Sequence, residues 1–264
     1  MKYIKSDALE IKMSKPDSTF VSFEVELIYN AVISSRKVFQ QLASFDSFDF
    51  FDTLGMRNLS GFIGEVVVKQ IEKQSSGFLE KNPHEDGYPD LILLDERGKE
   101  DIKNFSLYDK KPFSPFINGG IEVKCSCGMV PTDKKCKEMG LIHKPEIGES
   151  RQKILTGYDW KSHHRQTNNL LGLLWDFDNG VPAIIACFYS NALIENDWGK
   201  VVQPKPNSRT TSVSTMNRSG IKKMYDGCLF FRDDEFLISF LDKYNKSNSL
   251  SLIKNRQKTN IQKK

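Results

Sequence analysis

The chain reads Gly87-Tyr88-Pro89-Asp90-Leu91-Ile92-Leu93-Leu94 and, further along, Gly119-Gly120-Ile121-Glu122-Val123-Lys124. Both segments are short apolar runs that follow glycine or proline, which is typical of buried β-strands. Side chains alternate between the two faces of a strand, so Glu122 and Lys124 share one face and Ile121 and Val123 share the other. If the two strands are neighbours, Asp90, Glu122 and Lys124 converge on one spot.

Two carboxylates beside an ammonium group suit a divalent metal ion and a phosphodiester substrate. Mg²⁺ prefers carboxylate oxygens and keeps several of its waters, so two or three acids are enough ligands. Asp90 and Glu122 are therefore candidate ligands, and the backbone carbonyl of Val123 could add another oxygen. Such an ion lowers the pKa of a bound water and neutralises charge on phosphoryl oxygens. Lys124 would then hold the attacking water or stabilise the added negative charge.

Helical periodicity and apolar runs predict the elements around these two strands. Glu65 lies beside the buried stripe of the helix predicted from about Ser60 to Lys73, which makes it our candidate for a third acid at the site. The second half of the segment 160–175 is rich in leucine and could be a strand rather than a helix. The expected elements are one or two helices over Val21–Phe45, a helix opening near Ser60 and reaching Lys73, a turn over 96–99, an irregular insertion over 100–118, a helix over Trp160–Trp175, a buried strand over Val181–Tyr189 and a last helix over Phe236–Tyr244.

The composition predicts one folded domain with a basic tail. The 264 residues are 39% hydrophobic and carry a net charge of +4, which is enough apolar material for a core. The mild excess of basic residues is compatible with a polyanionic partner but does not demand one. We expect a single domain over 1–245, with a catalytic core at about 60–190 and a recognition region at about 200–225. The residues 246–264 would form a flexible basic tail.

The chain has no apolar run long enough to cross a bilayer, and its first residues lack the apolar core of a signal peptide. We therefore expect a cytoplasmic protein that does not contact the membrane. Its five cysteines are an odd number in a long chain, which favours reduced thiols over a disulfide framework. Cys125, Cys127, Cys136 and His143 are ligand types that Zn²⁺ takes. Their spacing matches no familiar zinc finger, so we favour ordinary thiols and leave zinc binding open.

Two polar segments, 161–169 and 205–223, carry side chains suited to contacting nucleic acid. Arginine, asparagine and glutamine side chains bind base edges and phosphates. Solvated surface loops have the same composition, so the pattern alone does not decide between recognition and plain surface. The candidate contacts are His164, Arg165, Gln166, Asn169, Arg209, Asn217, Arg218 and Lys222.

The pair Pro89-Asp90 followed by Glu122-Val123-Lys124 resembles the motif of the PD-(D/E)xK nuclease superfamily. The preceding helix that carries Glu65 is also similar to that family. The resemblance covers roughly residues 60–190 and implies an α/β fold with a restriction-endonuclease-like core, in which a mixed central β-sheet is flanked by helices. The long interval between Asp90 and Glu122 fits this pattern only if 100–118 is an insertion.

Within the superfamily, a chain of this size without a fused helicase motif is most similar to a type II restriction endonuclease. The resemblance implies a Mg²⁺-dependent enzyme in which Asp90 and Glu122 bind metal, Lys124 assists the attacking water and Glu65 supports the site. It also implies a homodimer that cuts double-stranded DNA at a palindromic site, with a cognate DNA methyltransferase as its functional companion.

Three other interpretations remain open from the sequence. A nuclease of the same fold could serve repair or recombination and recognise DNA structure or a lesion. The chain could be a DNA-binding module without catalysis. In the plainest interpretation, Asp90 only starts a strand, and Glu122 and Lys124 form part of a solvated sheet face.

Overall fold

The computed structural model describes residues 1–45, 49–204 and 212–244. The predicted basic tail over 246–264 lies outside these residues. The α-helices within them are α1 (Val25–Ala43), α2 (Phe50–Gln74), α3 (Glu96–Lys103), α4 (Asp133–Glu138), α5 (Arg218–Asp226) and α6 (Glu235–Tyr244), with short 3₁₀-helices η1 (Gln152–Ile154) and η2 (Glu195–Asp197).

The strands of the described residues build one large sheet and two small ladders. They are β1 (Tyr3–Lys5), β2 (Glu10–Ser14), β3 (Phe20–Glu24), β4 (Leu79–Lys81), β5 (Leu91–Leu93), β6 (Gly120–Ser126), β7 (Lys161–Ser162), β8 (Leu170–Asp178), β9 (Val181–Ser190), β10 (Ser214–Thr215) and β11 (Cys228–Arg232). Seven of these strands form the large sheet in the order β1-β11-β9-β8-β6-β5-β4, while β2 pairs with β3 and β7 with β10.

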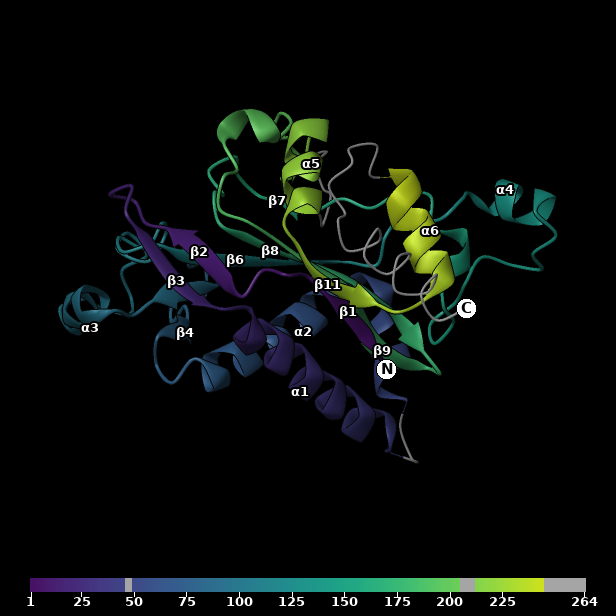
Figure 1. The fold of residues 1–264 in the computed structure, drawn as a ribbon, viewed down its shortest axis with the longest axis horizontal. Coiled ribbons are helices and arrows are strands. Elements are labelled where there is room, and N and C mark those ends of the chain that lie inside the picture. Colours follow the sequence, from purple (N-terminus) through teal and green to yellow (C-terminus); the bar gives the residue numbers. More distant parts are fainter. Residues whose placement is uncertain (46–48, 205–211, 245–264) are drawn as a thin grey trace.

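The large sheet is mixed, as predicted. Strands β6 and β8 run parallel, and the other described neighbours in the sheet run antiparallel. A parallel pair needs a long connection, and here the chain between β6 and β8 contains α4, η1 and β7. Helix α4 projects from the body of the molecule along this connection (Figure 1).

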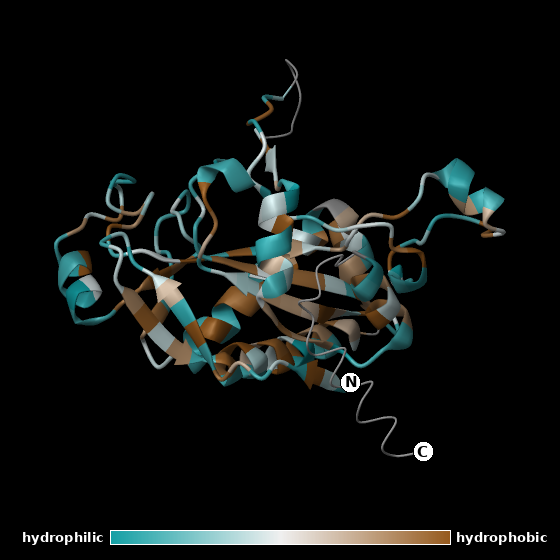
Figure 2. Ribbon diagram, turned by 45° about the horizontal axis from the view of Figure 1, so that its top comes forward, coloured by the Kyte–Doolittle hydropathy of each residue, from teal (hydrophilic) through white to brown (hydrophobic). Residues whose placement is uncertain are grey.

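Helices cover both faces of the sheet. Helices α1 and α2 pack on one face, and α5 and α6 lie on the other (Figure 1). Strand β8 serves both cores because alternate side chains point to opposite faces: Leu173 belongs to the α1–α2 side and Leu174 to the α5–α6 side. Hydrophobic residues are accordingly concentrated along the central strands (Figure 2). The predicted α/β class with a mixed central sheet flanked by helices is confirmed.

The helix predicted over Trp160–Trp175 is wrong. Residues 161–162 form β7, and the apolar run from Leu170 to Phe177 belongs to β8, as the alternative interpretation of its second half proposed. This strand lies between β6 and β9 and is buried on both faces, so it shows no alternation of polar and apolar residues. A run of this kind cannot be told from a buried helix by its periodicity.

The turn predicted over 96–99 is also wrong, because these residues open α3. Asp95 caps this helix by accepting a hydrogen bond from the backbone N–H of Gly98 (2.9 Å). The predicted insertion over 100–118 therefore begins inside a helix. Its later part carries Phe113 and Phe116, which are buried against β5 residue Ile92 in a small separate core.

The two N-terminal helix predictions are partly correct. The segment 21–45 contains α1, whose buried residues recur every three or four positions, but it starts with β3. The helix expected near Ser60 is the longer α2, which has a non-helical residue at Gly55 (φ 66°, ψ 154°). Strand β9 and helix α6 confirm the predictions for 181–189 and 236–244. No helix in the described residues is long and apolar enough to span a bilayer.

Candidate active site

Strands β5 and β6 bring the two predicted carboxylates together. Leu91 pairs with Ile121 in an antiparallel register, and Asp90 comes directly before β5. The backbone N–H of Val123 donates to Asp90 Oδ2 (2.8 Å), and the backbone N–H of Asp90 donates to Glu122 Oε2 (3.2 Å). Asp90 is therefore held by the backbone of β6, and Glu122 by the backbone of the residue just before β5.

Lys124 completes the cluster on the same face of β6. Its Nζ forms an ion pair with Glu122 Oε1 and lies 3.5 Å from Asp90 Oδ2. The side chain of Glu122 is only 7% exposed, whereas those of Lys124 and Asp90 are 23% and 32% exposed. The convergence predicted from the sequence is thus present, and the cluster opens to solvent through Asp90 and Lys124.

Burial and the charge of Lys124 have opposite effects on the pKa of Glu122. Burial and the neighbouring carboxylates likewise have opposite effects on the pKa of Lys124. Burial raises the pKa of Glu122 to about 7; the Lys124 ammonium opposes this shift, and the Asp90 carboxylate adds to it. Burial alone would lower the pKa of Lys124, but the carboxylates of Glu122 and Asp90 outweigh it and raise that pKa. Lys124 consequently stays a cation at neutral pH and cannot serve as a proton acceptor there.

The donor set fits a hard divalent cation. Asp90 and Glu122 each keep lone pairs beyond those used by the hydrogen bonds that hold them, and Mg²⁺ commonly binds through one or two carboxylates plus water and substrate phosphate. The N–H of Val123 points to Asp90, and the carbonyl of a strand residue lies on the same edge as its N–H, which leaves this oxygen on the Asp90 side of β6. Among the described residues, however, no group of three or more His, Cys, Asp or Glu side chains is arranged to hold a metal ion.

Glu65 does not join the cluster, so its predicted role as a third acid at the site is wrong. Its carboxylate pairs with Lys81 of β4 (2.5 Å), and its side chain is 58% exposed. The fully buried side chains of this helix include Ile63 and Val67. Position 65 stands two residues from each of them, which is about 200° around an α-helix, so it faces solvent.

Two aromatic groups adjoin the cluster, and one of them, Tyr88, was not predicted. The rings of Tyr88 and His164 meet edge to face with centroids 4.3 Å apart. Burial and the Glu122 carboxylate raise the pKa of the Tyr88 hydroxyl, which hydrogen-bonds to the side chain of Thr167. The only sequence signal for Tyr88 was its position two residues before Asp90.

The surroundings of His164 determine the protonation state and the tautomer of its ring. Burial and the positive charge of Lys124 lower the pKa of His164, which favours the neutral ring at neutral pH. The backbone N–H of Gln166 donates to His164 Nδ1 (3.2 Å). The neutral ring therefore carries its proton on Nε2, where it can donate a hydrogen bond but cannot accept one.

Asn169 is a structural residue, and its predicted contact with DNA is wrong. It is 2% exposed, and its side chain bonds to Ser14 N, Ser14 O, Gly120 O and the Tyr189 hydroxyl. Its backbone carbonyl accepts from the N–H of Glu122 (3.0 Å). Asn169 therefore positions the strand that carries the cluster, and its own polar atoms are satisfied inside the protein.

The two predicted recognition segments meet at η2. Arg165 donates to the side chain of Glu195 (2.8 Å) and to its carbonyl, while Asn217 donates to the carbonyl of Asn196 (3.0 Å). The segments also pair directly through β7 and β10. Gln166 is exposed in the first segment, Arg218 and Lys222 lie in α5, and Arg209 lies outside the described residues. No local sequence pattern indicated that these segments were neighbours.

The zinc hypothesis gains no support from the geometry. All five cysteines are free, and Cys136 is buried. Burial raises the pKa of the Cys125 thiol, which disfavours the thiolate that zinc requires. Cys125, Cys127, Cys136 and His143 lie in the described residues and form no metal-binding group there.

Comparison with known proteins adds no relative. No protein-family model matches the chain, and no curated protein or solved structure matches it. The class of the site therefore rests on its own geometry: two adjacent carboxylates, one of them deeply buried, with a lysine ammonium bonded to both.

Proposed function

We propose that this protein is a Mg²⁺-dependent endodeoxyribonuclease with a restriction-endonuclease-like core, and that it cuts double-stranded DNA at a specific sequence in the manner of a type II restriction enzyme. The observation that carries the proposal is the convergence of Asp90, Glu122 and Lys124 on the paired strands β5 and β6. On a solvated sheet face, Glu122 would not be buried and bonded to both Asp90 and Lys124.

Asp90 and Glu122 would hold Mg²⁺, with the Val123 carbonyl as a further ligand. When bound, this ion supplies charge neutralisation on the phosphate and acidifies a water molecule. Lys124, which remains charged, would donate hydrogen bonds to the attacking water or to a phosphate oxygen and so stabilise charge that develops in the transition state. His164, with its proton on Nε2, would donate to the substrate beside Lys124.

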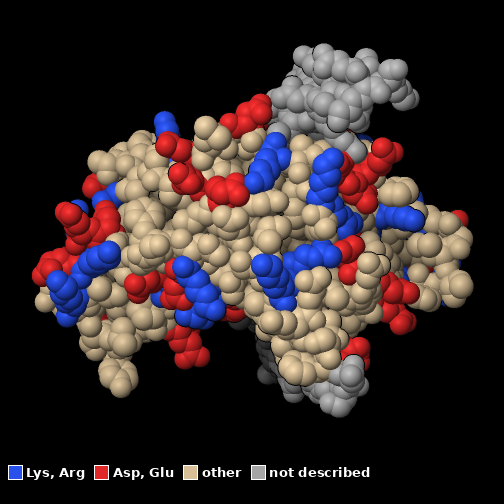
Figure 3. Space-filling view, turned by 60° about the horizontal axis from the view of Figure 1, so that its bottom comes forward, with Lys and Arg blue, Asp and Glu red and all other residues tan. Residues whose placement is uncertain are grey.

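Charge distribution argues against one side of the molecule as the DNA-binding side. The side of the molecule that carries α1 shows acidic and basic side chains interspersed (Figure 3), which gives no continuous positive field for a polyanion. The candidate contacts Arg165, Gln166, Asn217, Arg218 and Lys222 lie instead on segments gathered around η2 and α5. We place the recognition region there, in a homodimer whose two-fold axis would match a palindromic site.

The test is digestion of a sequenced plasmid by the purified protein with Mg²⁺ and, separately, with EDTA. The proposal predicts discrete fragments with Mg²⁺ alone, whose mapped ends share one sequence. Cleavage at ends that share no sequence but coincide with nicks, branches or lesions would point to a repair nuclease of the same fold. Binding without any Mg²⁺-dependent cleavage would contradict the enzyme assignment.

A further inference from the structure

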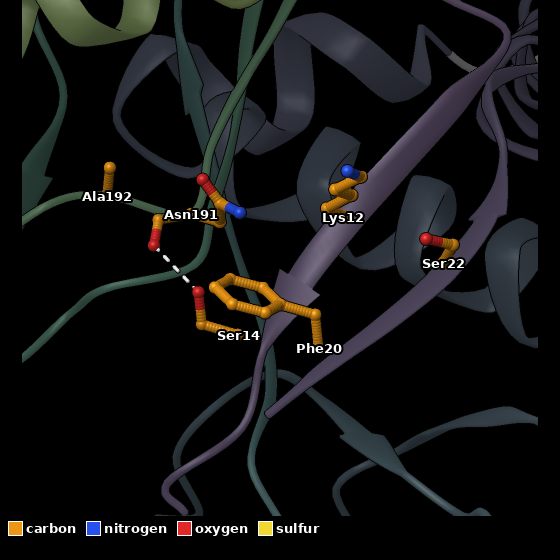
Figure 4. A pocket seen from close by; sticks show the side chains of 6 residues that line it. All are labelled: Lys12, Ser14, Phe20, Ser22, Asn191 and Ala192. Carbon is orange, nitrogen blue, oxygen red and sulfur yellow. Dashed lines mark hydrogen bonds between the residues drawn. The ribbon is translucent and has the colours of Figure 1, made fainter. Parts of the chain in front are cut away.

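A hollow of about 460 Å³ lies between the β2–β3 hairpin and the segment that follows β9 (Figure 4). It is open to solvent, and four of the six residues that line it have polar side chains. Its walls carry an ammonium group, an amide, two hydroxyls and one aromatic ring. These side chains are Lys12, Ser14, Phe20, Ser22 and Asn191, with Ala192 at the edge.

The hairpin that forms one wall is amphipathic, and Phe20 lies on its polar face. Ile11 and Met13 are buried in the core below β2, and the intervening residues of β2 point the other way. Ser14 pairs with Phe20 and Lys12 with Ser22 across the hairpin, so these side chains share the outer face. Phe20 is 61% exposed there. The ring is therefore accessible to a ligand in the hollow, with polar side chains around it.

Hydrogen bonds and an ion pair hold both walls of the hollow in place. Ser14 Oγ donates to the Asn191 carbonyl (3.0 Å), which ties the hairpin directly to the segment after β9. Lys223 Nζ donates to the Ala192 carbonyl (2.7 Å). At the hairpin tip, Lys15 forms an ion pair with Asp95 (2.8 Å) and is only 11% exposed. The hollow is therefore formed before any ligand arrives, which lowers the entropy lost on binding.

The hollow is connected to the candidate active site through one residue. The side chain of Asn169 bonds to both backbone polar atoms of Ser14, and its carbonyl accepts from the backbone N–H of Glu122. Ser14 in the wall of the hollow and Glu122 in the catalytic cluster are thus both bonded to Asn169.

We propose that this hollow binds an unpaired nucleobase of the DNA substrate, which stacks on the ring of Phe20. This inference rests on the proposed function and adds to it a distortion of the DNA at the bound site. Every base has a π-face, so an aromatic platform holds an unpaired base whatever its identity. The amide of Asn191 and the hydroxyls of Ser14 and Ser22 can bond to the polar edge of the base. Lys12 supplies a positive charge for the adjoining phosphate.

The test compares two labelled duplexes of one sequence, the first fully paired and the second with a single unpaired thymidine. Their affinities are measured by fluorescence anisotropy in EDTA, so that the DNA is not cut. We expect the second duplex to bind about tenfold more tightly, because base–aromatic stacking contributes on that scale. Phe20→Leu should abolish this preference, whereas Phe20→Tyr, which keeps a ring, should retain it.

Phe236→Leu is the matched control, since Phe236 lies on α6 and is 53% exposed. It should leave the preference unchanged. Equal affinity of the unaltered protein for the two duplexes, or a preference that survives Phe20→Leu, would overturn the inference. If the protein still cuts plasmid DNA with Mg²⁺ in that case, the proposed function stands without it. A protein that neither binds nor cuts DNA would overturn both.

Discussion

Two of the Glu–Lys ion pairs in the described residues, Glu122–Lys124 and Glu65–Lys81, differ in almost everything except their chemistry. Glu122 and Lys124 stand two apart on β6, with side chains 7% and 23% exposed, and both bond to Asp90 or its backbone. Glu65 and Lys81 join α2 to β4 at 2.5 Å, with side chains 58% and 40% exposed. Solvent screens the charges of Glu65 and Lys81 from each other. Glu122 and Lys124 are shielded from solvent, and each of them shifts the pKa of the other. Burial, rather than the identity of the residues, marks the pair that can do chemistry.

Replacing the lysine of each pair in turn should reveal the largest difference between the two pairs. Lys124→Met should reduce Mg²⁺-dependent plasmid cleavage by at least about a hundredfold, because it removes a donor aimed at developing charge. Lys81→Met should change the rate by less than about twofold, since an exposed pair contributes little. Initial rates of plasmid cleavage measure both effects. Similar losses in the two variants would remove the distinction drawn between the pairs.

The second prediction concerns the pH dependence of stability in the metal-free protein. The pKa of Glu122 is raised by burial to about 7, so the folded state holds this proton more tightly than the unfolded state does. That contribution is fully present below the unfolded pKa and is lost as pH rises through the folded one. Relative to Glu122→Gln, the free energy of unfolding should therefore fall between about pH 4.5 and pH 7, by about 1 kcal/mol or more.

Urea unfolding in EDTA across this range measures the difference. Glu65→Gln serves as the matched control, because Glu65 is exposed, and its unfolding free energy should run parallel to that of the unaltered protein. A Glu122→Gln variant with the same pH slope as the unaltered protein would mean that the buried carboxyl does not titrate as described.

His164 lies beside the buried pair, and its role as a hydrogen-bond donor can be tested directly. His164→Ala should lower the cleavage rate about tenfold, because it removes the Nε2–H donor next to Lys124. His164→Gln places an amide N–H near the same position and should restore most of the rate. His163→Ala is the control, since His163 is exposed and its Nδ1 lies 2.9 Å from the Ser212 carbonyl. Equal losses in the Ala and Gln variants would argue against a donor role.

The smallest effect is expected at the exposed acid. Glu65→Ala should change the free energy of unfolding by no more than about 0.5 kcal/mol and leave cleavage within about twofold of the unaltered rate. Thermal unfolding and the plasmid assay check the two statements. A large loss of cleavage with unchanged stability would return Glu65 to the active site and contradict the placement described above.

The cluster could be predicted because local rules fix it. The period of two along a strand puts Glu122 and Lys124 on one face, and the antiparallel neighbour brings Asp90 to the same place. The restriction-endonuclease assignment remains a prediction, since it depends on a resemblance in five residues. The mixed sheet was implied by the resemblance, whereas the apolar runs predicted the individual strands β5, β6 and β9.

The errors arose where position depends on contacts distant in the chain. The orientation of Glu65 depends on which stripe of α2 is buried, and an apolar helix with several candidate stripes does not reveal it. The burial of β8 on both faces erased the alternation that marks a strand. The contact of Tyr88 with His164, and the bonds from Asn169 to Ser14, join segments that no local pattern connects.

The most direct test of the central claim is supercoiled-plasmid cleavage by the unaltered protein and by Asp90→Asn, side by side with Mg²⁺ and with EDTA. Asp90→Asn keeps the size of the side chain and an oxygen that can accept from Val123, while it removes one negative charge from the cluster. We expect the unaltered protein to cut with Mg²⁺ alone and the variant not to cut, with both unfolding at similar temperatures. An unaltered protein that never cuts, or a variant that cuts as fast, would contradict it.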